Sequence, residues 1–292
     1  MMKKFDPAKT PNPEIHHLLL GAVAPRPIAL ASTVDRNGNP NLSPFSFYNA
    51  FGVNPTTLIF SPSRRGRDNT VKHTYENLKE VPEVVINAVT FPIVQQVSLS
   101  SSEFPKGVNE FEKSGLTAIP SETVKPFRVA ESPVQFECRV RDIIETGTGG
   151  GAANLIICEI NLIHVDEQVL DDNGRIDPNK IQLIGRMGGD YYVKATGEAL
   201  FKIQKPLAKP GIGIDSLPLK IRNSHLLTGN DLGQLGNIQE LPGDELVNEY
   251  REKFLKYSPA HHMAEDVVKE ARVLLAAGEN LQALLHLMAF LP

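Results

Sequence analysis

The densest group of side chains that could bind an anion lies between Ser61 and Thr70. This stretch, SPSRRGRDNT, combines three arginines with the hydroxyl groups of two serines and a threonine. A guanidinium group grips a phosphate through paired hydrogen bonds, and small hydroxyl groups donate to the remaining oxygens. The stretch therefore predicts a phosphate site, and the alternative interpretation is a solvated basic loop.

Two elements of secondary structure would position this stretch. Residues 57–60 are apolar and β-prone, so we expect a strand that ends at Ser61. Apolar residues at helical spacing follow, and we expect a helix over residues 69–80 with Asp68 or Asn69 as its N-cap. The free N–H groups at the start of such a helix would add to an anion site.

A polar and aromatic stretch, residues 41–50, comes just before the arginines. Pro44 lacks an N–H group, so we expect an edge strand or a bulged strand rather than a central one. The two stretches together suit a ligand with a flat ring at one end and a phosphate at the other, and FMN has that shape. The residues assigned to the ring are Ser46, Phe47, Tyr48 and Asn49, and those assigned to the phosphate are Ser61, Ser63, Arg64, Arg65 and Thr70.

The bulk composition is that of a globular chain with a large core. Of the 292 residues, 41% are hydrophobic and 22% are charged, and the formal net charge is −4. No basic field covers the chain, which argues against nucleic acid as a partner. The first residues lack the apolar segment of a signal peptide, and no run reaches the length of a membrane span. Cys138 and Cys158 occupy apolar-facing strand positions, so we expect a cytoplasmic protein with reduced core thiols.

No metal site is predicted. The doublets His16-His17 and His261-His262 are the histidine pairs that invite such an interpretation. Adjacent side chains on a helix or strand point in different directions, so neither doublet makes a good pair of ligands. The cysteines do not stand near them at ligand spacing.

Strand patterns dominate the chain from residue 28 to residue 192. Asn37-Gly38 suits a hairpin turn, residues 134–140 alternate between apolar and polar, and residues 155–165 form the longest strand candidate. Turn-separated antiparallel pairs outnumber helical crossovers. We therefore expect a mainly β fold, an antiparallel barrel with a few peripheral helices.

The composition changes after residue 204. A linker rich in proline and glycine leads into loop-like residues 224–243, and three amphipathic helices follow at 245–256, 259–276 and 279–291. We predict two domains, residues 1–205 and a C-terminal helical extension of residues 206–292. The apolar stripes of the last two helices are too short to be stable alone, so they must pack on each other, on the barrel or on a partner subunit.

Several segments resemble the flavin reductase-like, FMN-binding split-barrel family, to which flavoredoxins belong. They are PRPIALASTVD at 25–35, NLSPFSFYNAFGVNP at 41–55, SPSRR and DNT within 61–70, FEKSGL at 111–116, ESPVQFECRV at 131–140 and IGRMGGDYY at 184–192. The resemblance spans roughly residues 20–200. It implies a Greek-key split β-barrel, a homodimer, and FMN bound near the dimer interface.

The matching motifs also imply roles for individual residues. They place Ser46–Asn49 near the isoalloxazine ring and add Asp68 to the residues near the phosphate. In the family a histidine at the place of His164, at the end of the long strand, can lie near the flavin; the alternative is a histidine that caps the barrel rim. The family often shows Asp-Thr directly after a basic residue, whereas Asn69 separates Asp68 from Thr70 here. This leaves open which hydroxyl reaches the phosphate.

The resemblance implies an NAD(P)H-dependent flavin oxidoreductase. Hydride transfer from a nicotinamide to flavin N5 needs no general acid or base from the protein, so the catalytic side chains stay unassigned. The alternative is an FMN-binding electron carrier or flavin-storage protein without nicotinamide activity. A third hypothesis makes the helical extension an interaction module and the barrel its scaffold.

Overall fold

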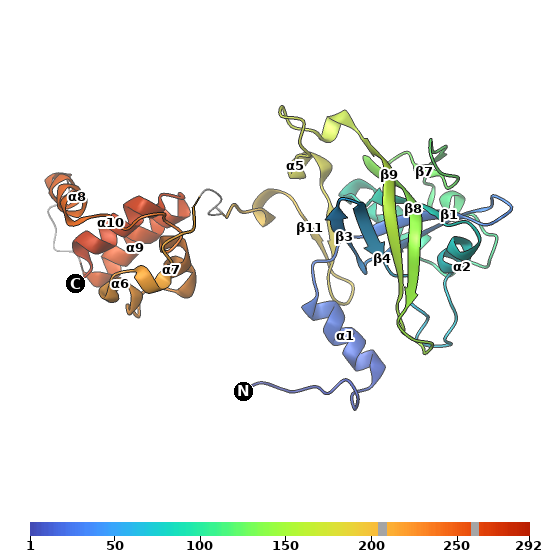
Figure 1. Ribbon diagram of the computed structural model, residues 1–292, viewed down its shortest axis with the longest axis horizontal. Helices are drawn as coiled ribbons and strands as arrows, with labels where there is room; N and C mark the ends of the chain where they lie inside the picture. Colours follow the sequence, from blue (N-terminus) through green and yellow to red (C-terminus); the bar gives the residue numbers. More distant parts are fainter. Residues whose placement is uncertain (204–208, 258–262) are drawn as a thin grey trace. The chain divides into compact units, whose positions relative to one another are not determined.

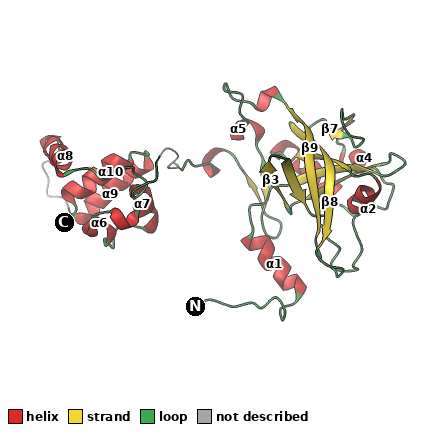
Figure 2. Cartoon of the chain, in the orientation of Figure 1, coloured by secondary structure: helices red, strands yellow, loops and turns green. Residues whose placement is uncertain are grey.

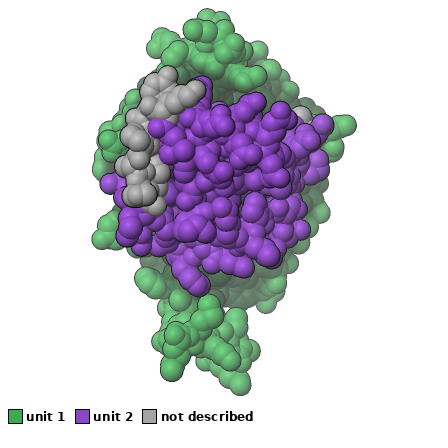
Figure 3. Space-filling view, turned by 90° about the vertical axis from the view of Figure 1, so that its left-hand side faces the viewer, with its two compact units in different colours: residues 1–200 green, residues 201–292 purple. Residues whose placement is uncertain are grey.

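The computed structural model describes residues 1–203, 209–257 and 263–292. They form two compact units, Met1–Leu200 and Phe201–Pro292 (Figure 3). Every strand of the described residues lies in the first unit, and the second unit is helical (Figure 2). The predicted boundary at residue 205, the predicted helix start at Pro259 and the doublet His261-His262 fall outside the described residues.

A seven-stranded antiparallel sheet forms the centre of the first unit, in the order β2-β1-β5-β8-β9-β4-β3 (Figure 1). Its strands are β1 (Ala29–Val34), β2 (Pro40–Phe45), β3 (Tyr48–Val53), β4 (Thr56–Phe60), β5 (Glu83–Ala88), β8 (Val134–Glu145) and β9 (Asn154–Val165). Two small sheets pair β6 (Ala118–Ile119) with β7 (Arg128–Val129) and β10 (Ile184–Arg186) with β11 (Tyr192–Lys194). The predicted mainly β, antiparallel fold is confirmed.

The sequence predicted one strand over residues 41–50, but these residues belong to two strands, β2 and β3. β2 and β3 are the two edges of the sheet, so Pro44 does lie on an edge strand. The side chains of Phe45 and Tyr48 both pack into the core, and the chain turns outward between them. The N–H of Ser61 donates to the carbonyl of Phe47 (2.9 Å), which fixes this turn beside the end of β4.

Buried apolar residues of the first unit form more than one cluster, and the cluster that contains both cysteines draws on β1, β4, β5, β8 and β9. Its buried members include Ala31, Phe60 and Ile156 together with Cys138 and Cys158. Both cysteines are free and buried, as predicted, and burial raises the pKa of the Cys138 thiol to about 12.

Short helices surround the sheet. They are α1 (Asn12–Ala22), α2 (His73–Glu80), α3 (Val94–Ser100), α4 (Glu110–Ser114) and α5 (Pro178–Ile181), with 3₁₀ turns at Phe91–Ile93, Glu167–Val169 and Gly197–Ala199. The predicted start of α2 at residue 69 and the predicted N-caps Asp68 and Asn69 are wrong, because Lys72 is the residue before the first turn. Asn69 has φ 58°, a left-handed conformation that cannot continue into a helix.

In the part of the second unit that the structure describes, the elements are a 3₁₀ turn and five helices. They are Ile214–Ser216, α6 (Leu219–Arg222), α7 (Gly229–Leu235), α8 (Asp244–Tyr257), α9 (Ala264–Ala276) and α10 (Asn280–Phe290). The apolar stripes of α9 and α10 share one buried core, with Val267, Ala271 and Leu284 at its centre. The expectation that residues 224–243 are loop is wrong in part, because Thr228 and Asp231 form a capping box that starts α7.

No helix among the described residues has the length and apolar character that a membrane crossing requires.

Candidate functional site

The arginine-rich loop between β4 and α2 is closed by its own backbone. The N–H of Arg65 donates to the carbonyl of Thr70 (2.8 Å), and the N–H of Asn69 donates to the carbonyl of Arg65 (2.9 Å). Asp68 accepts hydrogen bonds from the N–H (2.9 Å) and the hydroxyl (2.6 Å) of Thr70. Asp68 therefore orders the loop, and the hydrogen bonds from Thr70 are the main reason why the pKa of its carboxyl group is strongly lowered.

Arg65 is the central cation of this loop. Its side chain is only 15% exposed, and its Nη1 donates to Oγ1 of Thr70 (2.9 Å) and to the carbonyl of Val71. Its Nε donates to Oε1 of Glu103 (3.0 Å), and Nζ of Lys72 lies 3.7 Å from the same oxygen. The structure thus joins Arg65 and Thr70, which the sequence predicted, to Lys72 and Glu103, which it did not.

The start of α2 opens beside these cations. A small cavity of about 20 Å³ is lined by Arg65, Lys72, His73, Ser101 and Glu103, among others. The side chain of Lys72 makes no capping hydrogen bond to the first turn of α2. Two cations, the first residues of α2 and the Glu103 carboxylate therefore line one small cavity, and the cations and the helix N-terminus are groups that suit an oxyanion.

Arg64 and the serines take other positions in the loop. Arg64 donates from Nε to Oδ1 of Asn69 (2.7 Å) and from Nη2 to the carbonyl of Asn69 (2.7 Å). Arg64 therefore holds the left-handed residue Asn69 in place, and its guanidinium group does not join Arg65 at the cavity. The hydroxyl oxygens of Ser61 and Ser63 lie 3.1 Å apart and share one hydrogen bond.

The glycine-rich connection between β8 and β9 packs against the arginine-rich loop and forms hydrogen bonds with its backbone. The N–H of Arg64 donates to the carbonyl of Ala152 (2.9 Å), and Asn154 donates from Nδ2 to the carbonyl of Pro62 (3.0 Å). A Cβ atom on Gly150 would stand 3.1 Å from the carbonyl oxygens of Arg65 and Gly66. The sequence suggested a flexible connection, but its glycines permit close contact between two backbones.

The residues predicted for the ring divide between two sides of the sheet. Tyr48 packs into the core, where burial raises the pKa of its hydroxyl group. Phe47, 38% exposed, faces outward and meets His16 edge-on at a centroid distance of 6.4 Å, and Asn49 is also exposed. Ser46 Oγ accepts a hydrogen bond from Nε of the buried Arg26 (3.4 Å).

A cavity of about 190 Å³ adjoins Ser46. Its lining includes Val97, Ser101, Arg186 and Tyr192. The guanidinium group of Arg186 lies over the ring of Tyr192, 4.5 Å from the centroid. The N–H of Arg26 donates to the carbonyl of Arg186 (2.9 Å), and the N–H of Arg186 donates to the carbonyl of Arg26 (2.8 Å). The motif IGRMGGDYY therefore reaches the cavity through its arginine and its second tyrosine.

Ser101, which follows α3, lines both cavities, so the two are neighbours. One holds cations and helix amides, and the other combines an apolar wall with a few polar groups. FMN has a phosphate at one end and a flat ring at the other, so the donor set of the paired cavities fits it. The sequence missed Lys72, Ser101 and Arg186 because they come from separate segments that local patterns do not connect.

His164 lies at the opposite end of β9 from this loop. Phe60, the last residue of β4, pairs with Ile156, whereas His164 pairs with Gln135 near the start of β8. Its Nε2 is 2.8 Å from Oε1 of the fully buried Glu137. The structure places His164 in this buried polar cluster and not beside the arginine-rich loop.

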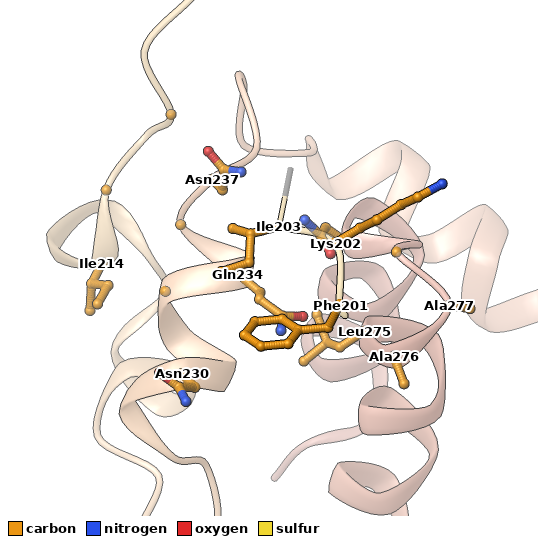
Figure 4. A pocket seen from close by; sticks show the side chains of 16 residues that line it. Phe201, Lys202, Ile203, Ile214, Asn230, Gln234, Asn237, Leu275, Ala276 and Ala277 are labelled. Atoms are coloured by element: carbon orange, nitrogen blue, oxygen red, sulfur yellow. The ribbon is translucent and has the colours of Figure 1, made fainter. Parts of the chain in front are cut away.

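The second unit holds a larger cavity, of about 830 Å³ (Figure 4). The ring of Phe201 points into it near Gln234 and Leu275, and Lys202 is the charged residue of its lining. None of the residues predicted for the flavin lines it. Across residues 1–203, 209–257 and 263–292, no group of three or more His, Cys, Asp or Glu residues could hold a metal ion.

Comparison with known proteins agrees with the fold of the first unit. An uncharacterised protein of Aquifex aeolicus is 38% identical over 200 residues, which cover 68% of this chain and 100% of the relative. The crystal structure of nitrilotriacetate monooxygenase component B from Bacillus cereus covers 70% of this chain and 99% of its own, with a TM-score of 0.65 and 28% identity. The flavoredoxin of Desulfovibrio vulgaris (Miyazaki F) covers 69% and 97%, with a TM-score of 0.54 and 26% identity.

These alignments span the relatives almost completely and leave about a third of this chain unmatched. Residues 21–180 match the model of the flavin reductase like domain, so the second unit lies beyond the match. The resemblance inferred from the sequence motifs and the expected split-barrel fold are confirmed. The chain belongs to the family of proteins with a flavin reductase like domain.

Proposed function

We propose that the first unit binds FMN and acts as an NAD(P)H-dependent flavin oxidoreductase. The observation that carries this proposal is the pair of adjoining cavities, one beside Arg65 and Lys72 and the other beside Ser46 and Arg186. Membership of the family supports it, as does the similarity to a component of a monooxygenase. The reduced, buried cysteines suit the cytoplasm, where nicotinamide nucleotides are available.

The residues of one cavity would bind the phosphate of FMN, and those of the other would bind its ring. Arg65 and Lys72 would bind the phosphate, together with the first amides of α2, and the hydroxyl of Thr70 would hold Nη1 of Arg65 in place. Ser46, held by Arg26, would bond the polar edge of the ring, and the wall formed by Tyr192 would orient it. FMN, when bound, supplies the hydride-accepting centre. The side chains position the reactants and exclude water, and no proton transfer by the protein is needed.

The alternative is an FMN-binding electron carrier or storage protein, and the likeness to flavoredoxin favours it. Steady-state oxidation of NADH and of NADPH with added FMN separates the two functions. A reductase oxidises many equivalents of nicotinamide for each protein chain. A protein that binds FMN and oxidises neither nucleotide is a carrier or store, and the oxidoreductase proposal then fails.

Replacing Arg65 by alanine is expected to weaken FMN binding tenfold or more. One lost charge-assisted contact costs about 1.5–3 kcal/mol, which corresponds to about one to two powers of ten in affinity. Riboflavin lacks the phosphate, so its affinity should not change. Flavin fluorescence titration measures both ligands, and Arg141→Ala, at an exposed ion pair on β8, is the matched control. Equal FMN affinity in wild type and Arg65→Ala would contradict the phosphate assignment.

We further propose that the protein is a homodimer. The edge strand β3 exposes Phe51 and Val53, and none of the eleven residues of α1 is buried. Exposed apolar edges tend to pair, and a helix of this length is marginal without a packing surface. A second copy of the chain would cover both features, and the family resemblance points to the same assembly.

Light scattering should therefore report twice the chain mass of 32.1 kDa. Phe51→Lys is expected to shift the mass to that of one chain, because a lysine ammonium resists burial in an apolar contact. Val273→Lys changes an equally exposed apolar residue in the second unit and should leave the dimer intact. A wild-type protein that is monomeric with flavin bound would refute the proposal.

A further inference from the structure

Glu103 meets the cations of the arginine-rich loop from outside that loop. It follows α3, in a segment that Lys106 ties to Glu76 of α2 through a 3.0 Å ion pair. Its Oε1 accepts from Nε of Arg65 (3.0 Å), its Oε2 accepts from Nη2 of Arg67, and its side chain is 38% exposed. One carboxylate therefore pairs with both guanidinium groups.

These contacts occupy donors that a phosphate would use. The Nε of Arg65 is bound to Glu103 and its Nη1 is bound to Thr70 and Val71. Carboxylate and phosphate oxygens approach a guanidinium group along the same directions, so both cannot hold the Nε edge of Arg65 at once. The two anions would also repel each other across this distance.

Lys72 is a further cation that faces the carboxylate of Glu103. Its Nζ lies 3.7 Å from Oε1 of Glu103. Arg65, Lys72 and Glu103 line the same small cavity. An incoming phosphate would thus find the positive charge at Arg65 and Lys72 partly neutralised. Arg64 offers no substitute there, because its guanidinium group binds Asn69.

We propose that Glu103 competes with the phosphate of FMN for Arg65 and so keeps the flavin exchangeable. This inference rests on the proposed function, since it needs the phosphate to bind at Arg65. Binding of FMN then includes the displacement of Glu103, and release of FMN is assisted by its return. A ligand without a phosphate neither displaces Glu103 nor benefits from its removal. Glu103 thus limits the preference for FMN over riboflavin and favours flavin as an exchanging substrate.

Glu103→Gln in the full-length protein tests the competition. The change keeps the size of the side chain and removes its charge, and the expected result is FMN binding about two- to fivefold tighter, the range of a partly exposed ion pair. The gain should come mainly from slower release of FMN, measured by stopped-flow displacement. Riboflavin affinity should stay unchanged. Glu159→Gln removes an equal charge from an ion pair on β9 and should change neither affinity.

The outcomes separate this inference from the proposed function. If Arg65→Ala weakens FMN binding and Glu103→Gln leaves it unchanged or weaker, the phosphate assignment stands and competition is refuted. If Arg65→Ala has no effect, both are refuted. If Glu103→Gln tightens FMN and riboflavin equally, the phosphate is not the group that Glu103 opposes, and the inference fails. Glu103→Ala should act in the same direction as Glu103→Gln, which guards against an effect of the new amide.

Discussion

Replacing Glu137 by alanine is expected to destabilise the first unit by about 3–5 kcal/mol, the cost of removing one partner of a buried ion pair, here with Nε of Arg128 at 3.7 Å. Glu137 lies on β8 with no exposed surface. It accepts hydrogen bonds from the N–H of Glu122 (2.9 Å), from the N–H and hydroxyl of Thr123 (2.6 and 2.7 Å) and from His164 (2.8 Å). Alanine would leave these part-buried donors and the guanidinium group of Arg128 without their acceptor.

The same carboxylate makes the stability depend on pH. Burial raises the pKa of Glu137, but the hydrogen bonds from Glu122, Thr123 and His164 outweigh it and lower the pKa to about 2 from an ordinary value of 4.5. A lowered folded-state pKa stabilises the fold above the unfolded-state value. This contribution is therefore complete above pH 4.5 and disappears as the pH falls toward 2.

Urea unfolding at pH 7 and at pH 3.5 measures both effects. Wild type should lose more stability between the two values than Glu137→Gln, which keeps the side-chain size but cannot ionise. Glu159→Ala, at a partly exposed pair on the neighbouring strand, should cost at most about 1 kcal/mol. A free energy of unfolding that is the same for Glu137→Ala and Glu159→Ala would contradict the role assigned to the buried carboxylate.

Replacing Leu284 by alanine is expected to destabilise the second unit by about 2–5 kcal/mol and leave the first unit unchanged. Leu284 lies on α10, is fully buried, and belongs to a core whose members all come from residues 217–291. Removing it leaves a cavity in that core alone. Leu281 lies on the same helix and is 43% exposed, so Leu281→Ala should have a small effect.

Scanning calorimetry should show two transitions, with Leu284→Ala lowering one of them. FMN affinity should stay at the wild-type value, because none of the residues assigned to FMN lies in the second unit. If Leu284→Ala lowers both transitions, or weakens FMN binding, the second unit supports the flavin site. That result would favour packing of the C-terminal helices on the barrel, one of the alternatives that the sequence left open.

Much of the fold was predictable because it depends on local periodicity. The alternation in residues 134–140 and the apolar run in residues 155–165 predicted the strands β8 and β9, and Cys138 and Cys158 are buried as expected. The alternation was wrong about Gln135 and Glu137, which it placed on a polar face and which the structure buries. The stripe on α9 predicted its buried face correctly for Val267 and Ala271. The motif order was enough to identify the family, since each segment holds its place in the chain.

The start of α2 could not be predicted from residue types alone. Asp68 and Asn69 are good N-cap residues by type, but Arg64 and Asp68 bind the backbone of residues 69 and 70 and hold Asn69 left-handed. The helix therefore begins later, after Lys72. The competing contacts come from a loop conformation that propensities do not describe.

The sequence by itself determined the longer strands, the buried face of α9 and the chemistry available at the arginine-rich loop. Only the tertiary structure decided how that chemistry is arranged. It split residues 41–50 between the two edges of the sheet, turned Tyr48 inward and Phe47 outward, and placed His164 with Glu137. It also brought Glu103 and Lys72 to Arg65. These contacts join residues far apart in the chain, and they depend on strand order and loop closure, which no local spacing of residue types encodes.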